Sequence, residues 1–244
     1  MLYLIGLGLG LEGISSEGLE IAKRCKAVYL ENYTIEFPYS TKLIEEIVGK
    51  KIKMADRTFI ESLEIVDEAQ KKDVALLIYG SPLTATTHIV LIEECKKSEI
   101  KCRVIYAGSV FDSVPECGLQ IYKFGKIASM PKWIPDKKFE PESFMEIVKE
   151  NKTIGAHSLI LCDIGLEIGD AVRQLQIAAA RYNFKNIGRI VVCSRLGTRD
   201  QHIWYDFVEK FENKKIRAPY CIIIPGKLHF MEEEILKEWE VRER

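Results

Sequence analysis

The segment LYLIGLGLGLEGISSEGLEIAKRC, residues 2–25, decides how the chain begins to fold. Its first five residues are apolar, as in a strand buried on both faces. A helix is expected to follow, capped by Ser15 or Ser16, with Glu17 in its first turn. Glycines occupy the turn between strand and helix, at positions 6, 8, 10 and 13. The segment therefore predicts a strand, a tight turn and a helix, with little side-chain bulk where the chain leaves the strand.

The spacing Gly8-x-Gly10-x-x-Gly13 also matches the dinucleotide fingerprint. In that motif the third glycine lies in the first helical turn and the pyrophosphate lies at the helix N-terminus. Here the helix is expected to begin after the motif, and Glu17 would repel a phosphate. Glu31 stands where a ribose-binding acid would be, which leaves an NAD-binding oxidoreductase as an alternative. The preferred interpretation is a bare main chain against which a flat ligand can lie.

Short apolar runs alternate with helical patterns through the first 106 residues. Ser40 is expected to cap a helix that ends at Gly49, and Thr58 with Glu61 has the spacing of a capping box. Residues 86–98 form a further helical pattern, with Glu93 and Lys97 four residues apart. The expected strands are residues 2–6, 27–31, 51–55, 74–80 and 102–108. Strands joined by helices predict a parallel α/β sheet.

The second half has a looser order. Four prolines between residues 115 and 141, with several lysines, indicate a junction rather than a core element. The expected elements beyond it are strands at 157–164, 189–194 and 220–226 and amphipathic helices at 167–182 and 229–240. With a boundary near residue 120, the sequence predicts two α/β domains, residues 1–120 with a parallel sheet and 121–244 with a mixed sheet. A ligand cleft is expected between them.

Composition limits the classes of function. The 244 residues include 47% hydrophobic and 29% charged residues, with 35 basic against 36 acidic side chains. This balance argues against a nucleic-acid-binding protein. No apolar run is long enough for a membrane span, and no signal peptide is evident, which indicates a cytoplasmic protein. The seven cysteines and four histidines are scattered, which predicts buried free thiols and no metal site.

Several loops after predicted strands carry small hydroxyl side chains. The runs are GSPLTATTH (80–88), AGSVFDS (107–113), SRLGTR (194–199) and PYCIIIPGKLHF (219–230). The first two follow strands of the parallel sheet, so they open on its carboxyl ends, where ligands collect. The threonine-rich run is also expected to offer free backbone N–H groups at a helix start. Together these loops indicate a ligand held mainly by backbone and small hydroxyl groups.

With these runs in view, the chain resembles the tetrapyrrole methylase superfamily, the class III S-adenosylmethionine-dependent methyltransferases, and within it the diphthine synthase family. The resemblance extends from residue 2 to 230 through LYLIGLGL, GLEIAKRC, GSPLTATTH, GLQIYKFGK, LILCDI and IIIPGKLH. It implies two α/β domains, a homodimer, and S-adenosyl-L-methionine bent into the cleft, with S-adenosyl-L-homocysteine as product. The implied cofactor contacts are Leu9, Ser81, Thr84, Ser109, Val110, Cys162, Leu196 and Tyr220.

The resemblance also implies a substrate: the amino group of the modified histidine of translation elongation factor 2, methylated repeatedly in diphthamide biosynthesis. Ser81 departs from the family pattern, which has aspartate there. A serine offers one neutral hydroxyl where a carboxylate accepts charge-assisted hydrogen bonds, a difference of roughly 1–2 kcal/mol in cofactor binding. Asp163 is the candidate to compensate.

Methyl transfer from a sulfonium to an amine needs alignment and a neutral nitrogen, with no covalent nucleophile or metal. We therefore assign no catalytic residue from the sequence. His88 and His229 are interpreted as structural, and three lysines, at positions 123, 126 and 227, as candidates for docking a protein substrate. The alternatives are a corrinoid (precorrin) methyltransferase, a non-catalytic protein that binds S-adenosylmethionine, and the oxidoreductase.

Overall fold

The computed structural model describes residues 1–184 and 186–240. The chain divides into two compact units. The first unit comprises residues 1–112 and 197–199, and the second comprises residues 113–196 and the chain from residue 200. The division into domains 1–120 and 121–244 stays a prediction. Each unit is described by itself.

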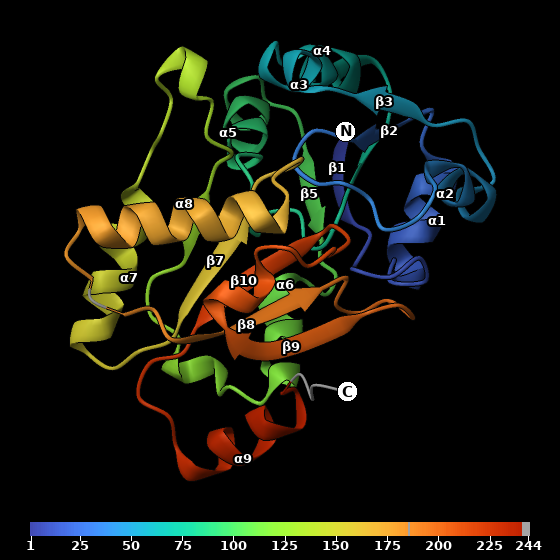
Figure 1. The fold of residues 1–244 in the computed structure, drawn as a ribbon. Coiled ribbons are helices and arrows are strands. Elements are labelled where there is room, and N and C mark those ends of the chain that lie inside the picture. Colours follow the sequence, from blue (N-terminus) through green and yellow to red (C-terminus); the bar gives the residue numbers. More distant parts are fainter. Residues whose placement is uncertain (185, 241–244) are drawn as a thin grey trace. The chain divides into compact units, whose positions relative to one another are not determined.

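The first unit is built on a five-stranded parallel sheet, as predicted (Figure 1). Leu2 pairs with Val74 on one side and with Cys102 on the other, so the first strand lies inside the sheet. The strands are β1 (Leu2–Gly6), β2 (Ala27–Glu31), β3 (Lys53–Ala55), β4 (Val74–Ile78) and β5 (Cys102–Ile105). Their order is β3-β2-β4-β1-β5.

Helices cover both faces of this sheet, which explains why the inner strands β1 and β4 are apolar throughout. Leu4 and Leu76 pack on the face that buries Ile65 and Leu91, whereas the opposite face buries Ile21 and other apolar side chains. The helices are α1 (Ser16–Arg24), α2 (Thr41–Val48), α3 (Arg57–Glu61), α4 (Glu64–Lys71) and α5 (Ile89–Lys97). The first two contribute to one core and the other three to the second.

Two predicted helix starts are confirmed and one is wrong. The Ser15 side chain accepts a hydrogen bond from the Gly18 amide at 3.1 Å, and Ser40 caps α2. Thr58 does not begin a helix, because the cap is Asp56, whose carboxylate accepts from the Phe59 amide at 2.8 Å. Leu63 has φ +63°, a left-handed conformation that separates α3 from α4. The segment after Asp56 therefore forms two helices, α3 and α4.

The second unit contains a mixed sheet, also as predicted, in the order β6-β7-β10-β8-β9. Its strands are β6 (Ala128–Met130), β7 (Ser158–Cys162), β8 (Arg189–Ser194), β9 (His202–Phe207) and β10 (Tyr220–Ile224). The β6–β7 pair is parallel and the other pairs are antiparallel. Strand β6 corrects the expectation of a junction, since Ala128 and Met130 are fully buried.

The helices α7 (Ser143–Thr153) and α8 (Ile168–Arg181) bury Phe144, Val148 and Leu175 in one core with the second sheet. The remaining helices are α6 (Val110–Ser113) and α9 (Phe230–Glu238), with short 3-10 turns at Val114–Cys117, Ile121–Lys123, Pro135–Lys137 and Val208–Phe211. All seven cysteines are free, as expected, and five of them are buried. Within the described ranges, no helix is long and apolar enough to cross a lipid bilayer.

Candidate functional site

The candidate site lies where three neighbouring strands of the first sheet end. We call the loops after β1, β4 and β5 (residues 6–10, 79–84 and 106–110) the carboxyl rim. Strands β4 and β1 are neighbours in the sheet. The connection from β1 passes over β4 to reach β2, whereas the connection from β4 passes over β1, in the opposite direction, to reach β5. Adjacent parallel strands whose connections run in opposite directions create the crevice in which α/β sheets bind ligands.

Two loops of the carboxyl rim are bonded to each other. The Gly8 amide donates to the Gly80 carbonyl at 3.1 Å, and the Gly80 amide donates to the Gly8 carbonyl at 3.0 Å. Both residues have positive φ, +69° and +70°, which favours glycine. The glycine turn and the start of the threonine-rich loop thus form one rigid unit.

Most glycines of the opening segment make room for the chain itself. A Cβ on Gly6 would lie 2.7 Å from the Gly80 carbonyl oxygen. A Cβ on Gly10 would lie 2.6 Å from the Gly197 carbonyl oxygen, and one on Gly13 would lie 2.7 Å from that of Leu7. At these positions the side-chain space is occupied by backbone, so tight chain packing accounts for the glycines.

Open space is found instead at Gly108, and Gly80 has only ordinary contacts. Among the described residues other than its two chain neighbours, none has an atom within 4 Å of a Cβ built on Gly108, and the nearest atoms to one on Gly80 are 3.9 Å away. Ser81 and Ser109 follow these glycines and are only 8% and 4% exposed. The carboxyl rim therefore offers bare main chain beside two small hydroxyl residues, which fits a ligand held by backbone groups.

The threonine-rich loop is ordered by its own hydrogen bonds. The Thr84 amide donates to the Ser81 carbonyl at 3.0 Å, and the Thr86 hydroxyl donates to the Pro82 carbonyl at 2.7 Å. Helix α5 begins at Ile89, three residues later than predicted. The Thr86 hydroxyl is thus used inside the loop, whereas Thr84 is half-buried at the carboxyl rim.

Ser109 is held by an aspartate that sequence reasoning did not single out. Its hydroxyl and its amide both lie 2.7 Å from the same Asp112 carboxylate oxygen. These bonds lower the pKa of Asp112, so the carboxylate stays ionised and fixes the start of α6. The hydroxyl and the amide of Ser109 are therefore both engaged within this loop.

Glu31 does not fit the role of a ribose-binding acid. Its carboxylate is fully buried and accepts hydrogen bonds from the amides of Tyr33 and Thr34 at 2.8 Å each, and from the Thr34 hydroxyl at 2.6 Å. Helix α1 also begins at Ser16, after the glycine motif. Both features weigh against a dinucleotide site.

The eight residues implied as cofactor contacts fall in both units. Leu9, Ser81, Thr84, Ser109 and Val110 belong to the first unit and lie along the carboxyl rim. The other three, Cys162, Leu196 and Tyr220, lie at one end of the second sheet, at the end of β7, after β8 and at the start of β10.

Tyr220 is the best-defined residue of that second group. Its hydroxyl donates to the Leu166 carbonyl at 2.7 Å. Burial raises the pKa of Tyr220, and burial likewise raises the pKa of the Cys162 thiol, so both stay protonated at neutral pH. Leu196 is 6% exposed. This group supplies a neutral, largely apolar surface.

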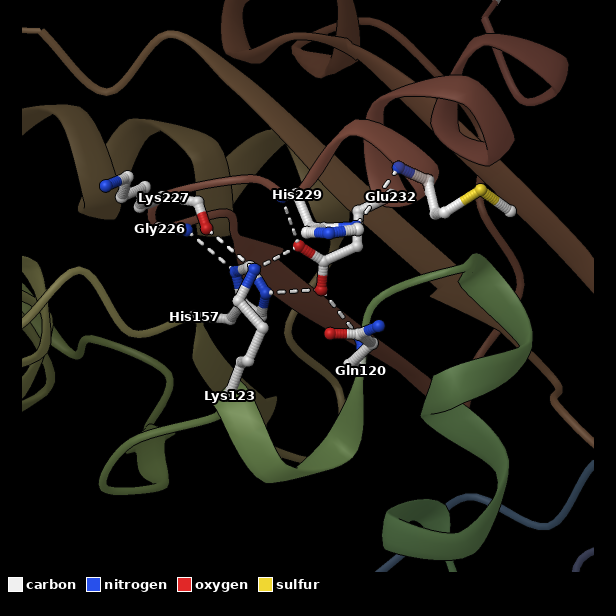
Figure 2. Close-up of polar contacts among 8 residues, drawn as sticks. Gln120, Lys123, His157, Gly226, Lys227, His229 and Glu232 are labelled. Carbon is white, nitrogen blue, oxygen red and sulfur yellow. Dashed lines mark hydrogen bonds and ion pairs between the residues drawn. The ribbon is translucent and has the colours of Figure 1, made fainter.

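A buried ionic network occupies the opposite end of the second sheet (Figure 2). The Gly226 amide donates to Nδ1 of His157 at 2.9 Å, so Nε2 carries the proton and donates to Glu232 at 3.1 Å. The second Glu232 oxygen pairs with Lys123, which also donates to the Lys227 carbonyl at 2.8 Å. We call these five residues the His157–Glu232 network.

Two backbone amides complete the coordination of Glu232. Those of Gln120 and His229 donate to the carboxylate at 3.0 and 2.8 Å (Figure 2). Burial favours a higher pKa for Glu232, but Lys123, the two amides and His157 outweigh it and lower the pKa to about 2. Burial lowers the pKa of His157. Glu232 is therefore ionised and His157 neutral at pH 7.

The network shows what the motifs YKFGK and PGKLH do in the second unit. Lys123 and Gly226 come from these motifs, and His229 caps α9 through its side chain, which accepts from the Met231 amide at 3.4 Å. Lys126 pairs with Glu150 at 2.5 Å. Lys123 and Lys126 thus hold loops of this unit. Among the described residues, Lys227 is the one candidate docking lysine with an exposed side chain and no ion pair.

His157 and Glu232 were missed by sequence reasoning. Glu232 lies three residues after His229, the spacing of a capping box, and this pattern was the available signal. His157 precedes a strand without any motif. Among residues 1–184 and 186–240, no group of histidine, cysteine, aspartate or glutamate side chains is arranged to hold a metal ion.

Comparisons with known proteins agree with this architecture. Residues 1–211 match the model of the Tetrapyrrole (Corrin/Porphyrin) Methylases. The chain is 37% identical to "Diphthine synthase" of Methanocaldococcus jannaschii, covering 97% of this chain and 98% of the relative. It is 34% identical to the human "Diphthine methyl ester synthase", covering 100% and 96%.

A solved structure described as a putative diphthine synthase from Entamoeba histolytica superposes with a TM-score of 0.90 at 30% identity, covering 100% of this chain and 99% of that chain. Fold and sequence thus agree over the full length of the chain. The chain belongs to the tetrapyrrole (corrin/porphyrin) methylase family, and it is an S-adenosylmethionine-dependent methyltransferase.

Proposed function

We propose that this methyltransferase adds three methyl groups to the amino group of the modified histidine of translation elongation factor 2, in diphthamide biosynthesis. The observation that carries the proposal is the full-length similarity to proteins named diphthine synthase and diphthine methyl ester synthase. A corrin or porphyrin methylase would share the family model, but the relatives reported above carry the diphthine names.

We propose the carboxyl rim of the first unit as the surface that binds S-adenosyl-L-methionine. Gly108 leaves open space there, and Ser81 and Ser109 flank it with small, mostly buried side chains. Backbone groups of Leu9, Thr84 and Val110 complete the proposed contacts. For Cys162, Leu196 and Tyr220, contact with the cofactor remains a prediction that rests on the resemblance.

The cofactor, when bound, supplies an electrophilic methyl group on sulfur. The chain's part is to align a neutral amine with that methyl group and to exclude water from it. Each of the first two transfers leaves a proton on nitrogen. We assign no residue as the base: His88 is fully buried behind the threonine-rich loop, and His229 caps α9. Solvent accepts these protons in the proposed mechanism.

A second candidate activity is formation of a methyl ester on the same modified histidine. Relatives from human, cattle and Arabidopsis thaliana are named for that product, at 33–34% identity and over 99–100% of this chain. The two activities share the cofactor and the protein substrate and differ in whether a carboxylate is also methylated.

We also propose that the chain forms a homodimer, which the resemblance implies, and that it is cytoplasmic. Sedimentation equilibrium measures its mass in solution, and fractionation of the native cells measures its location. A monomeric mass at micromolar concentration would contradict the first statement, and recovery with membranes would contradict the second.

The test uses elongation factor 2 from a cell that lacks this chain, incubated with the purified protein and methyl-labelled S-adenosylmethionine. We expect label on the modified histidine, with mass spectrometry of the peptide giving the number of methyl groups. Mild alkali removes an ester methyl and leaves N-methyl groups, which separates the two activities. Methylation of a precorrin, with none on the elongation factor, would refute the proposed substrate.

A further inference from the structure

We infer that His88 is a positioning residue that holds the Pro82 carbonyl and thereby fixes the Ser81–Thr84 turn at the carboxyl rim. The inference rests on the proposed function, because the turn matters for catalysis only if the carboxyl rim binds the cofactor. The geometry of the loop, however, can be tested without any ligand.

The Pro82 carbonyl is the point at which the loop is anchored. It lies 3.2 Å from Nδ1 of His88 and 2.7 Å from the Thr86 hydroxyl. Pro82 directly follows Ser81, and the Ser81 carbonyl accepts from the Thr84 amide at 3.0 Å. Two donors from later in the chain therefore converge on the middle of the turn that carries Ser81.

The tautomer of His88 follows from this contact. A carbonyl oxygen can only accept, so Nδ1 carries the proton and Nε2 has a lone pair. His88 is fully buried, and in the described part of the chain Nε2 has no hydrogen-bond partner. Leaving a buried acceptor unpaired costs free energy, which a purely space-filling apolar side chain would avoid. The bond from Nδ1 to Pro82 is therefore the feature of His88 that a hydrocarbon cannot replace.

The surroundings hold the imidazole in place. The Tyr33 ring meets it edge-on, with centroids 6.5 Å apart and an interplanar angle of 78°. Tyr33 is itself fixed by Glu31, whose carboxylate accepts from its amide at 2.8 Å. Burial lowers the pKa of His88, which keeps the ring neutral and the tautomer defined. Glu31, the candidate ribose-binding acid, thus has a structural role. It fixes Tyr33, whose ring packs against His88, and His88 holds the Pro82 carbonyl.

The test compares His88→Asn with His88→Leu. An asparagine amide places its NH2 group close to the position of Nδ1 and keeps the donor, whereas leucine fills the space without one. Two readouts are measured: hydrogen exchange of the Thr84 amide without ligand, and the Kd of S-adenosylhomocysteine. Ile65→Val, at a fully buried position of α4, is the control for a general loss of stability.

In His88→Leu we expect the exchange rate of the Thr84 amide and the Kd of S-adenosylhomocysteine each to rise about tenfold, which corresponds to one lost hydrogen bond. In His88→Asn and Ile65→Val we expect both quantities to stay within about threefold of wild type. Equal exchange in all the variants would overturn the inference. If His88→Leu does not fold, His88→Gln takes its place, because the longer glutamine side chain moves the donor toward the Nε2 position. Identical exchange rates and Kd values in His88→Gln and His88→Asn would then overturn the inference.

Failure of the proposed function looks different. A wild-type protein that does not bind S-adenosylhomocysteine, with Thr84 exchange still dependent on the Nδ1 donor, would refute the cofactor site and support the positioning role. Wild-type binding that is unchanged in His88→Leu, despite faster Thr84 exchange, would overturn the link between His88 and the cofactor.

Discussion

Gly8 and Gly80 exchange two backbone hydrogen bonds, at 3.1 and 3.0 Å, although 72 positions (80 − 8) separate them in the sequence. This pairing joins the loops after β1 and β4 and so fixes the backbone of two of the three loops of the carboxyl rim. It also explains why Gly6 is required, since its missing side chain lets the Gly80 carbonyl approach. The open part of the carboxyl rim is then the side next to Gly108.

Gly108→Ala tests whether Gly108 leaves space for the ligand or is needed for the stability of the fold. Its new methyl group enters open space, so we expect the free energy of unfolding to stay within about 1 kcal/mol of wild type. The same methyl group occupies the proposed cofactor space, and we expect S-adenosylhomocysteine to bind at least about tenfold more weakly, a loss of about 1.4 kcal/mol. Urea unfolding and calorimetric titration measure the two effects.

Gly6→Ala is the matched control. Its methyl group would lie 2.7 Å from the Gly80 oxygen and 2.9 Å from the Ala107 Cβ, so overpacking should cost about 1–3 kcal/mol of stability. Unchanged cofactor affinity in Gly108→Ala would show that the ligand lies elsewhere.

Ser81→Asp introduces the carboxylate that the resemblance expects. We predict roughly tenfold tighter binding, because a carboxylate interacts with the cationic groups of the cofactor more strongly than a hydroxyl does. S-adenosylmethionine, which has a sulfonium, should gain more than S-adenosylhomocysteine, which has a neutral thioether. Titration with both ligands tests this; unchanged affinity for both would indicate that Ser81 does not face them.

Glu232→Gln should weaken the second unit without touching the cofactor site. The variant replaces a buried carboxylate that pairs with Lys123 and accepts two amides, and the expected loss is about 2–3 kcal/mol. His157 of the network precedes Cys162 by five residues, about 17 Å at the usual rise of a strand. The Kd of S-adenosylhomocysteine should therefore be unchanged, and Glu233→Gln on the same helix is an exposed control.

The pH dependence of this variant has a defined sign. The pKa of Glu232 is lowered from 4.5 to about 2 in the folded protein, so the stability it contributes is complete above pH 4.5 and is lost as the pH falls toward 2. The difference in unfolding free energy between wild type and Glu232→Gln should be constant from pH 5 to 7 and shrink below about 4.5. A difference that grows on acidification would contradict the assignment.

Asp56→Ala and Thr58→Ala test which residue caps α3. Loss of the Asp56 cap should cost about 1 kcal/mol, whereas Thr58 should cost less than about 0.5 kcal/mol. Thermal unfolding of the two variants measures this directly, and the reverse order would restore Thr58 as the cap.

Local sequence patterns predicted much of the first unit, because its inner strands β1 and β4 are apolar runs and the helices α1 and α2 begin after Ser15 and Ser40 with side-chain caps. They misplaced the start of α3 because Asp56 and Thr58 both have capping chemistry, and only the left-handed Leu63 shows that the helix is interrupted. A positive φ at a leucine is set by packing, which no short motif records.

The limits at the site have a similar cause. Glycine spacing could not distinguish a glycine that leaves open space from a glycine packed against the backbone of another segment. Such backbone contacts, as between Gly10 and Gly197, join segments far apart in the sequence. His157 and Glu232 lie 75 residues apart, and Asp112 stood in a loop where only the small hydroxyl side chains drew attention. Strand β6 was hidden among prolines and lysines, since three residues are too few to show a period.

The most direct test is a crystal structure of the protein with S-adenosylhomocysteine. We predict the ligand on the carboxyl rim, with its atoms against the open face of Gly108 and within hydrogen-bonding distance of Ser81 and of the backbone at Ser109 and Val110. Density for the ligand away from these loops, or side chains filling the space beside Gly108, would contradict the account.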